Sequence, residues 1–210
     1  MSTMESLRAS IVDHAHSLFV RGLVSSTAGN ISAVLDDGTF LVSPTGCCFG
    51  RLKEDELTHM KADGTVLSGP KPTKEYPLHF AFYEVQPDAR AILHLHSPWA
   101  TALSCLNGLD LQNVIPPVTP YLLMRLGPVP MIPYEKPGDL KLVDHIHELA
   151  VGRKALMMAN HGTLVSGKDV DQAVYNAEEL EETARLYMRI RHDDHRLLSA
   201  DQVQELLNYA

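Results

Sequence analysis

Two histidines two residues apart in one apolar stretch are the first residues whose spacing suggests chemistry. His94 and His96 lie in the run AILHLHS, which is typical of a buried strand. Residues i and i+2 of a strand point to the same face, roughly 7 Å apart at Cα. Two imidazoles placed in this way can bind one divalent ion, with Zn–N distances of about 2.0–2.1 Å. Taken alone, the pattern fits two histidines on a half-buried strand face equally well.

A third ligand must come from another part of the chain, and His161 is the best candidate. It follows an apolar strand in the sequence MMANHGTLV, and Gly162 after it permits a sharp turn that would aim the imidazole into a site. Three protein ligands with one open position are typical of catalytic rather than structural zinc sites. The sequence therefore predicts a catalytic metal centre at His94, His96 and His161.

Two further His-x-His pairs lie in predicted helices: His14 with His16, and His145 with His147. Residues two apart on a helix are about 200° apart around its axis, so neither pair can chelate one ion. We interpret these four histidines as surface or interface residues.

The segment GPKPTKEYPLHFAFYE supplies a carboxylate at a predicted helix start. Pro77 is tolerated only in the first helical turn, so the helix should begin at about Lys74. Thr73, Lys74 and Glu75 would then surround a helix N-terminus, where free N–H groups and the helix dipole attract phosphate or carboxylate. On this segment alone, a plain capping arrangement with solvated charges is the favoured interpretation.

Two loops of small residues could also face an anion. The segment SSTAGNIS contains Thr27 and Asn30, and VSPTGCCFG contains Thr45 and Gly46. Loops of this kind can present backbone N–H groups to an anion. Each loop taken singly fits an ordinary turn.

The elements that must position these residues alternate along the chain. Hydrophobic periodicity and turn residues predict hairpins around Asp37-Gly38 and Asp63-Gly64. Residues 108–137 are proline-rich and predicted to be irregular, and Ser199 is a predicted helix cap. The predicted helices are 4–21, 74–86, 97–107, 139–150, 169–191 and 199–210, and further strands are predicted at 90–96, near 129–133, and at 154–160 and 163–167. This order predicts one α/β domain over residues 1–210, with a mainly antiparallel sheet covered by helices on both faces.

The composition limits the class of protein. The 210 residues include 45% hydrophobic and 21% charged residues, which is ordinary for a globular protein. The net charge of −8 argues against nucleic-acid binding, although local donors can still bind an anionic small molecule. The three cysteines, without a C-x-x-C pair, suggest neither a disulfide framework nor a cysteine zinc site. Because the sequence shows no signal peptide and no membrane span, a cytoplasmic location is expected.

Taken in order, the segments TAGNIS, SPTG, KPTKEYPLHFAFYEVQPDARAILHLHS and ANHGTLVSG resemble the class II aldolase/adducin family over residues 5–190 or so. The resemblance implies that His94, His96 and His161 bind one divalent ion per subunit, Zn²⁺ or else Mn²⁺ or Co²⁺, beside Glu75 as acid or base. It further implies a class II aldolase-like three-layer fold and a homotetramer. The phosphate-binding residues that it implies are Thr27, Asn30, Thr45, Gly46, Thr73 and Lys74. Aldolases of this type tend to carry two serines before the glutamate, so Thr73 and Lys74 indicate a different anion geometry or substrate.

The segment TPYLLMRLGPVPMIPYEKPGD is similar to the branch of this family that decarboxylates 3-oxo-tetronate 4-phosphate to dihydroxyacetone phosphate. Tyr121 and Arg125 are therefore possible substrate contacts. Arg125 could hold a carboxylate through two hydrogen bonds, although a surface arginine fits equally well. Tyr209 could reach a neighbouring subunit's site, or could pack on its own subunit. His79, one helical turn after Glu75, is interpreted as a supporting residue.

These features predict a metal-dependent carbon–carbon lyase that decarboxylates a small phosphorylated sugar acid through an enediolate. A class II aldolase that cleaves a phosphorylated ketose or sugar acid is the alternative. A non-catalytic interaction protein of the adducin type is the alternative from another class, and retention of the three histidines and Glu75 argues against it. Neither a nucleic acid nor a membrane is expected as a partner.

Overall fold

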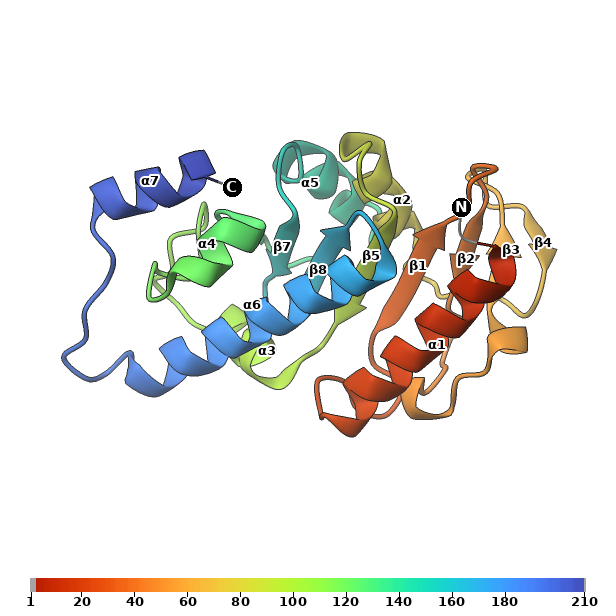
Figure 1. The fold of residues 1–210 in the computed structure, drawn as a ribbon, viewed down its shortest axis with the longest axis horizontal. Helices are drawn as coiled ribbons and strands as arrows, with labels where there is room; N and C mark the ends of the chain where they lie inside the picture. Colours follow the sequence, from red (N-terminus) through yellow and green to blue (C-terminus); the bar gives the residue numbers. More distant parts are fainter. Residues whose placement is uncertain (1–2, 210) are drawn as a thin grey trace.

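A mixed sheet of eight strands forms the centre of the molecule (Figure 1). The computed structural model describes residues 3–209, with the side chain of Tyr209 left outside that description. The strand order is β4-β3-β2-β1-β5-β8-β7-β6, and every neighbouring pair is antiparallel except β6 with β7. The strands are β1 (Asn30–Val34), β2 (Phe40–Val42), β3 (Thr58–Met60), β4 (Val66–Ser68), β5 (Ala91–Leu95), β6 (Met131–Ile132), β7 (Ala155–Met158) and β8 (Gly162–Gly167).

Helices cover both faces of this sheet and complete three layers. The larger core joins one face of the sheet to α1, α3, α4 and α6, and a second core joins the other face to α2 and α5. The predicted fold class is therefore confirmed. The helices are α1 (Met4–Val20), α2 (Tyr76–Val85), α3 (Pro98–Ser104), α4 (Pro120–Leu126), α5 (Lys141–Leu149), α6 (Val170–Ile190) and α7 (Ala200–Tyr209).

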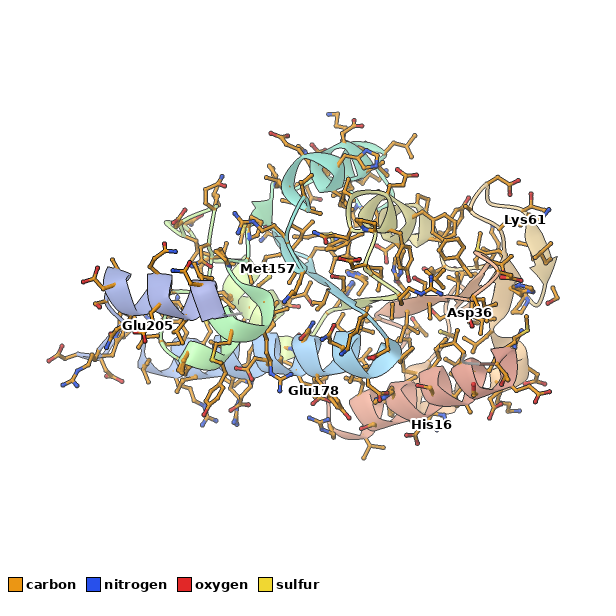
Figure 2. All side chains as sticks on the ribbon, turned by 45° about the horizontal axis from the view of Figure 1, so that its top comes forward. His16, Asp36, Lys61, Met157, Glu178 and Glu205 are labelled. Atoms are coloured by element: carbon orange, nitrogen blue, oxygen red, sulfur yellow. The ribbon has the colours of Figure 1, made fainter. Side chains whose placement is uncertain are left out.

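Apolar side chains lie between the layers, and most charged side chains lie on the outer surface. Met157 of β7 lies in the interior, whereas Glu205 on α7 and Lys61 in the β3–β4 turn project from the periphery (Figure 2). Within the described part of the chain, no helix is both long and apolar enough to cross a membrane.

The alternation of side chains along β5 directs the polar residues to the α2 face. Leu93 belongs to the larger core and Ile92 to the core beneath α2 and α5. Because successive strand residues point to opposite faces, His94 shares the face of Ile92. Asn30 of β1 is the register partner of His94, so it lies on this face as well. A strand that is otherwise apolar thus brings its histidine to the helix that carries Glu75.

Most predicted elements are present, with ends shifted by one to three residues. Helix α4 is present in the structure but was not among the helices predicted from the sequence. The predicted hairpins are formed, with Gly38 at φ 80° and Gly64 at φ 87°, and Ser199 accepts a hydrogen bond from the Gln202 N–H at the start of α7. The irregular segment 108–137 contains α4 in addition to the expected strand. Its prolines suggested a break, but Pro120 occupies the first helical turn, where the missing N–H costs nothing.

The four histidines in helical His-x-His pairs have separate partners, which confirms that neither pair converges on one point. The contacts are His14 with Asp171, His16 with the Leu52 carbonyl oxygen, His145 with Glu135 and His147 with Glu84.

Candidate metal centre

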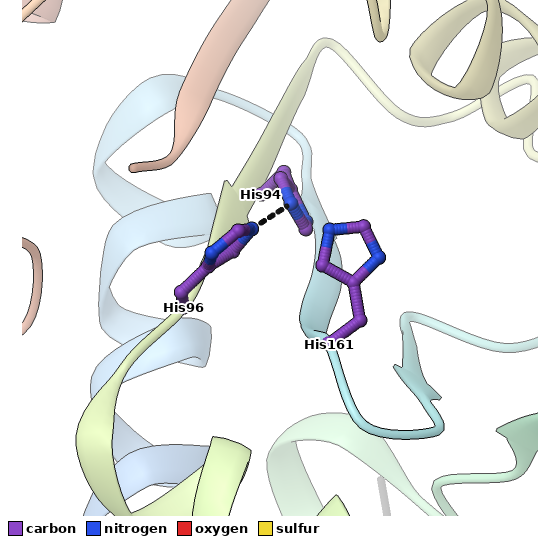
Figure 3. A group of neighbouring side chains, drawn as sticks. All are labelled: His94, His96 and His161. Carbon is purple, nitrogen blue, oxygen red and sulfur yellow. Dashed lines mark hydrogen bonds between the residues drawn. The ribbon is translucent and has the colours of Figure 1, made fainter. Parts of the chain in front are cut away.

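The imidazoles of His94, His96 and His161 face one another in a single cluster (Figure 3). Their ring centroids are 4.8, 4.9 and 4.7 Å apart. One nitrogen from each ring can be chosen so that all three lie within 4.8 Å of one another. His94 is the last residue but one of β5, His96 directly follows the strand, and His161 comes from the turn between β7 and β8. The two separate segments therefore meet as the sequence predicted.

The protonation of His94 suits metal binding. Its Nδ1 lies 2.8 Å from the Thr163 carbonyl oxygen, which can only accept, so Nδ1 carries the hydrogen. Nε2 then keeps its lone pair and lies 2.9 Å from Nε2 of His96. Burial lowers the pKa of His94 to about 3, and burial also lowers the pKa of His96 and of His161. Neutral imidazoles whose second nitrogen is held by a carbonyl are the usual form of metal-binding histidines.

The turn that places His161 depends on two neighbours in different ways. Asn160 adopts φ 55°, a left-handed conformation that asparagine tolerates better than most residues. Gly162 is the first residue of β8, and a Cβ atom there would lie 2.2 Å from the Leu95 carbonyl oxygen. The expectation that Gly162 forms the sharp turn is wrong, because Asn160 supplies the left-handed residue. Gly162 is required instead by the close approach of β5.

Glu75 stands next to the three imidazoles. Its Oε2 is 3.5 Å from Nε2 of His94, and its Oε1 is 3.6 Å from Nε2 of His161. Asn30 donates a hydrogen bond of 2.7 Å from Nδ2 to Oε2. Burial acts to raise the pKa of Glu75, but His94, the Asn30 hydrogen bond and His161 outweigh it, so the pKa lies below its ordinary value. The carboxyl group is thus ionised and close enough to exchange a proton with a molecule bound at the histidines.

The helix that carries Glu75 begins slightly later than predicted. Glu75 is the N-cap of α2, the first helical residue is Tyr76, and Pro77 lies in the first turn. Thr73 accepts a hydrogen bond of 3.3 Å from the Glu75 N–H through its hydroxyl oxygen. The conformation before the helix therefore fixes the position from which the carboxylate extends.

A cavity of about 340 Å³ adjoins Glu75 and His96 and collects the predicted phosphate-binding residues. Its walls carry hydroxyl groups, an amide, an exposed lysine and glycine backbone, which together offer donors to an anion. All six predicted residues line it: Thr27, Asn30, Thr45, Gly46, Thr73 and Lys74. The arrangement can hold an anionic group on one side and present the adjoining atoms to the histidines and Glu75.

Pro137 and Gly138 also line this cavity and were not predicted as site residues. They belong to the segment YEKPGD, whose resemblance to the decarboxylase branch was the available signal. The segment leads from the irregular region 108–137 to the cavity. Its sequence has no periodic pattern from which this position could be predicted.

Tyr121 and Arg125 do not line the cavity in their own subunit. Both lie on α4, whose Leu122 and Leu126 pack into the core on the sheet face opposite α2. Tyr121 is 63% exposed, and Arg125 lines a separate surface hollow with Glu178. Within one subunit these two residues therefore lie away from the cavity, and their contact with substrate stays a prediction. The predicted role of the Tyr209 side chain lies outside the described residues.

Comparisons with known proteins agree with this arrangement. The family model described as the class II aldolase and adducin N-terminal domain matches residues 9–188. A 3-oxo-tetronate 4-phosphate decarboxylase of Pectobacterium atrosepticum is 46% identical over 206 residues, which cover 98% of this chain and 94% of the relative. An L-fuculose phosphate aldolase of Shigella flexneri is 32% identical over 184 residues, or 87% of this chain and 82% of the relative. The crystal structure of YgbL from Klebsiella pneumoniae matches with a TM-score of 0.95 and 46% identity, covering 97% of this chain and 99% of that one.

Proposed function

Because the chain belongs to the class II aldolase/adducin family, we propose that it is a lyase that decarboxylates 3-oxo-tetronate 4-phosphate. Curated proteins with this activity in their names are 43–46% identical over nearly the full chain, and further relatives are class II aldolases. The observation that carries the proposal is the position of Glu75, between three converging histidines and a cavity lined by anion donors.

His94, His96 and His161 would hold the divalent ion that class II aldolases use. When bound, the ion supplies a Lewis acid that polarises the carbonyl group of the substrate. Three neutral imidazoles suit Zn²⁺ with one position left for substrate, and Mn²⁺ or Co²⁺ can use the same ligands. Zinc is the metal we propose.

The cavity orients the substrate for the reaction. Thr45, Thr73 and Lys74 donate to the phosphate group at one end, together with the backbone at Gly46. The other end of the four-carbon acid then extends toward Glu75 and His96, which border the same cavity. Binding energy from the phosphate thus places the reacting carbons, although the phosphate itself does not react.

The bond changes require one proton. Cleavage of the bond between C1 and C2 releases CO₂ and leaves its electron pair on the enediolate of C2 and C3. Protonation at C2 then gives dihydroxyacetone phosphate. Glu75 is ionised at rest, so it takes a proton from water and delivers it to C2 as a general acid.

An aldolase activity is the second candidate, because 32% identity to an L-fuculose phosphate aldolase covers most of the chain. Cleavage of a phosphorylated ketose or sugar acid would use the same enediolate and the same phosphate donors. Thr73 and Lys74, where such aldolases tend to have two serines, favour the decarboxylase. An interaction protein of the adducin type would not need the three histidines beside Glu75.

The test is incubation of purified, zinc-loaded protein with 3-oxo-tetronate 4-phosphate, with CO₂ and dihydroxyacetone phosphate measured together. We expect equal amounts of both products, and none from a variant in which His94, His96 and His161 are all replaced by alanine. Turnover of L-fuculose 1-phosphate without decarboxylation would establish the aldolase instead. A homotetramer in a cytoplasmic location remains part of the proposal, and the sedimentation coefficient tests the assembly.

A further inference from the structure

A continuous chain of hydrogen bonds runs from Glu75 into the core between α2 and β1. Asn30 donates to Oε2 of Glu75 at 2.7 Å, and Oδ1 of Asn30 lies 2.5 Å from Nε2 of His79. Nδ1 of His79 lies 2.8 Å from the Ser32 hydroxyl, and that hydroxyl lies 2.9 Å from the Tyr83 hydroxyl. Three residues, Asn30, His79 and Ser32, therefore connect the Glu75 carboxylate to the half-buried Tyr83.

Matching repeats of the helix and the strand create this chain. Glu75, His79 and Tyr83 are four residues apart, so they lie along one face at or near α2, with about 6 Å between successive members. Asn30 and Ser32 are two residues apart on β1, so they share a face with about 6.8 Å between them. The two spacings are nearly equal, and each polar side chain of the helix therefore meets one from the strand.

The direction of every hydrogen bond follows from the ionised carboxylate. Glu75 can only accept, so Asn30 turns its NH₂ group toward Glu75 and its oxygen toward His79. His79 must then carry its hydrogen on Nε2 and accept at Nδ1 from the Ser32 hydroxyl. Tyr83 lies at the end of the chain, and its hydroxyl hydrogen has two acceptors on Ser32: the hydroxyl oxygen at 2.9 Å and the backbone carbonyl oxygen at 3.0 Å.

Burial makes this arrangement costly to alter. His79 and Ser32 are fully buried and Asn30 is nearly so. Burial also lowers the pKa of His79 to about 4, which keeps the imidazole neutral. A buried donor or acceptor without a partner costs free energy, so removal of one member leaves the next one unsatisfied. The Asn30 amide is therefore held in one orientation by a histidine that does not reach the cavity.

We propose that His79 is a positioning residue that, through Asn30, makes Oε2 of Glu75 a permanent acceptor and leaves Oε1 to carry the transferred proton. Oε2 is occupied by the Asn30 N–H, whereas Oε1 faces His161. This role adds a positioning residue to the proposed function. It rests on the proposed function in one respect, which is that Glu75 is the acid–base residue. If His79 were merely a core residue, the orientation of Asn30 would not depend on it.

The kinetic test compares His79→Leu, which removes both polar contacts, with His79→Gln, which can still donate to Asn30. For the leucine variant we expect kcat to fall about 10–100-fold, the range found when partners of active-site groups are removed, with KM and zinc content nearly unchanged. The glutamine variant should recover most of kcat. Ser32→Ala, which removes the donor to Nδ1, should give an intermediate loss and serves if the leucine variant does not fold.

Two controls separate positioning from general damage. His147→Gln changes a surface histidine and should leave all parameters unchanged, and Ile146→Ala loosens the same α2–α5 core without touching the chain of hydrogen bonds. Ile146→Ala should lower the melting temperature while kcat is kept. If His79→Leu keeps kcat, or if the glutamine variant is as slow as the leucine variant, the proposal is wrong.

Two further measurements distinguish failure of this proposal from failure of the proposed function. Exchange of the carbon-bound hydrogens of the hydroxymethyl group of dihydroxyacetone phosphate in D₂O requires Glu75 and the enediolate but no decarboxylation. The exchange rate should be lowest for His79→Leu, intermediate for Ser32→Ala and nearly restored for His79→Gln. This order is expected even if the substrate is not a 3-oxo acid. ¹⁵N NMR of the zinc-loaded protein should show His79 with hydrogen on Nε2, and hydrogen on Nδ1 would overturn the proposal.

Discussion

Gly162 and Leu95 approach each other so closely that a Cβ atom on the glycine would meet the Leu95 carbonyl oxygen at 2.2 Å. The contact joins β8 to β5 at the end of the sheet where both strands lead into the histidine cluster. His96 follows Leu95, and His161 precedes Gly162. The distance between the two strands at this point therefore controls the distance between two of the three imidazoles.

The first prediction concerns Gly162→Ala. The added methyl group must push β8 from β5, so we expect zinc affinity to fall at least tenfold, as measured by competition with a chromogenic chelator. Gly167→Ala is the matched control, since its Cβ would meet the Ala173 nitrogen at 2.2 Å at the other end of β8. That variant should lose stability and retain zinc affinity. Equal zinc affinities for the two variants would contradict this explanation.

The second prediction is a loss of stability in acid for the metal-free protein. Burial lowers the pKa of His79 to about 4 and that of His94 to about 3 from 6.5. Between pH 6.5 and about 4 the unfolded chain binds protons that the folded chain does not, so the free energy of unfolding falls as the pH falls. The slope is about 1.4 kcal/mol per pH unit for each histidine. Above pH 6.5 these two residues contribute no dependence.

Urea denaturation of chelator-treated protein between pH 4 and 8 measures this effect. His79→Gln should reduce the slope by about 1.4 kcal/mol per pH unit, because the contribution of one histidine is removed. His147→Gln, at a partly exposed position on α5, should leave the slope unchanged. A free energy of unfolding that does not vary from pH 6.5 to 4.5 would count against the burial argument.

The third prediction concerns Glu181 of α6, which caps the short helix α3. Its two carboxylate oxygens accept hydrogen bonds of 2.8 Å from the N–H groups of Trp99 and Ala100, and the residue is only 7% exposed. In Glu181→Gln an NH₂ group would face one of these donors, so we expect a loss of about 1–3 kcal/mol in unfolding free energy. Glu182→Gln, at an exposed carboxylate, should cost less than about 0.5 kcal/mol in the same urea titration.

The Glu181 contact also bears on the metal centre, because α3 begins two residues after His96. We expect Glu181→Gln to weaken zinc binding in addition to lowering stability. Unchanged zinc affinity in a destabilised variant would show that His96 is held by β5 alone.

The fourth prediction tests phosphate binding by Lys74, which lines the cavity with an exposed side chain. Lys74→Ala should raise KM about 10-fold or more, with a smaller change in kcat, since the phosphate does not take part in bond cleavage. Lys71→Ala, at an exposed lysine outside the lining of this cavity, should leave KM unchanged. A fall in kcat at constant KM would instead assign Lys74 to the reacting end of the substrate.

Sequence reasoning found the cluster because its signals are local. Alternation in AILHLHS places His94 and His96 on one face, and the helix start is marked by Pro77. The register between strands has no such local signal, so the pairing of Asn30 with His94 and the contact of Asn30 with His79 could not be predicted. The family resemblance implies that Asn30 binds phosphate, whereas its side chain forms hydrogen bonds with Glu75 and His79.

The irregular region escaped prediction for a related reason. Helix α4 is formed by packing of Leu122 and Leu126 against the large core, in a segment whose prolines hide the helical period. The path of YEKPGD to the cavity is likewise set by tertiary contacts, so only resemblance pointed to Pro137 and Gly138. Resemblance also pointed to Tyr121 and Arg125, which lie elsewhere in the subunit.

The place of β5 in the strand order has a consequence for how the protein would exchange its metal. β5 is flanked by β1 and β8, so the strand that carries His94 has no free edge. Edges and termini open locally at low cost, whereas central strands open only when the whole domain unfolds. The imidazoles should consequently remain assembled while peripheral segments fray. An arriving ion would meet a preorganised site. The rate at which the ion dissociates would be set by ligand exchange at the cavity mouth and not by local unfolding of the sheet.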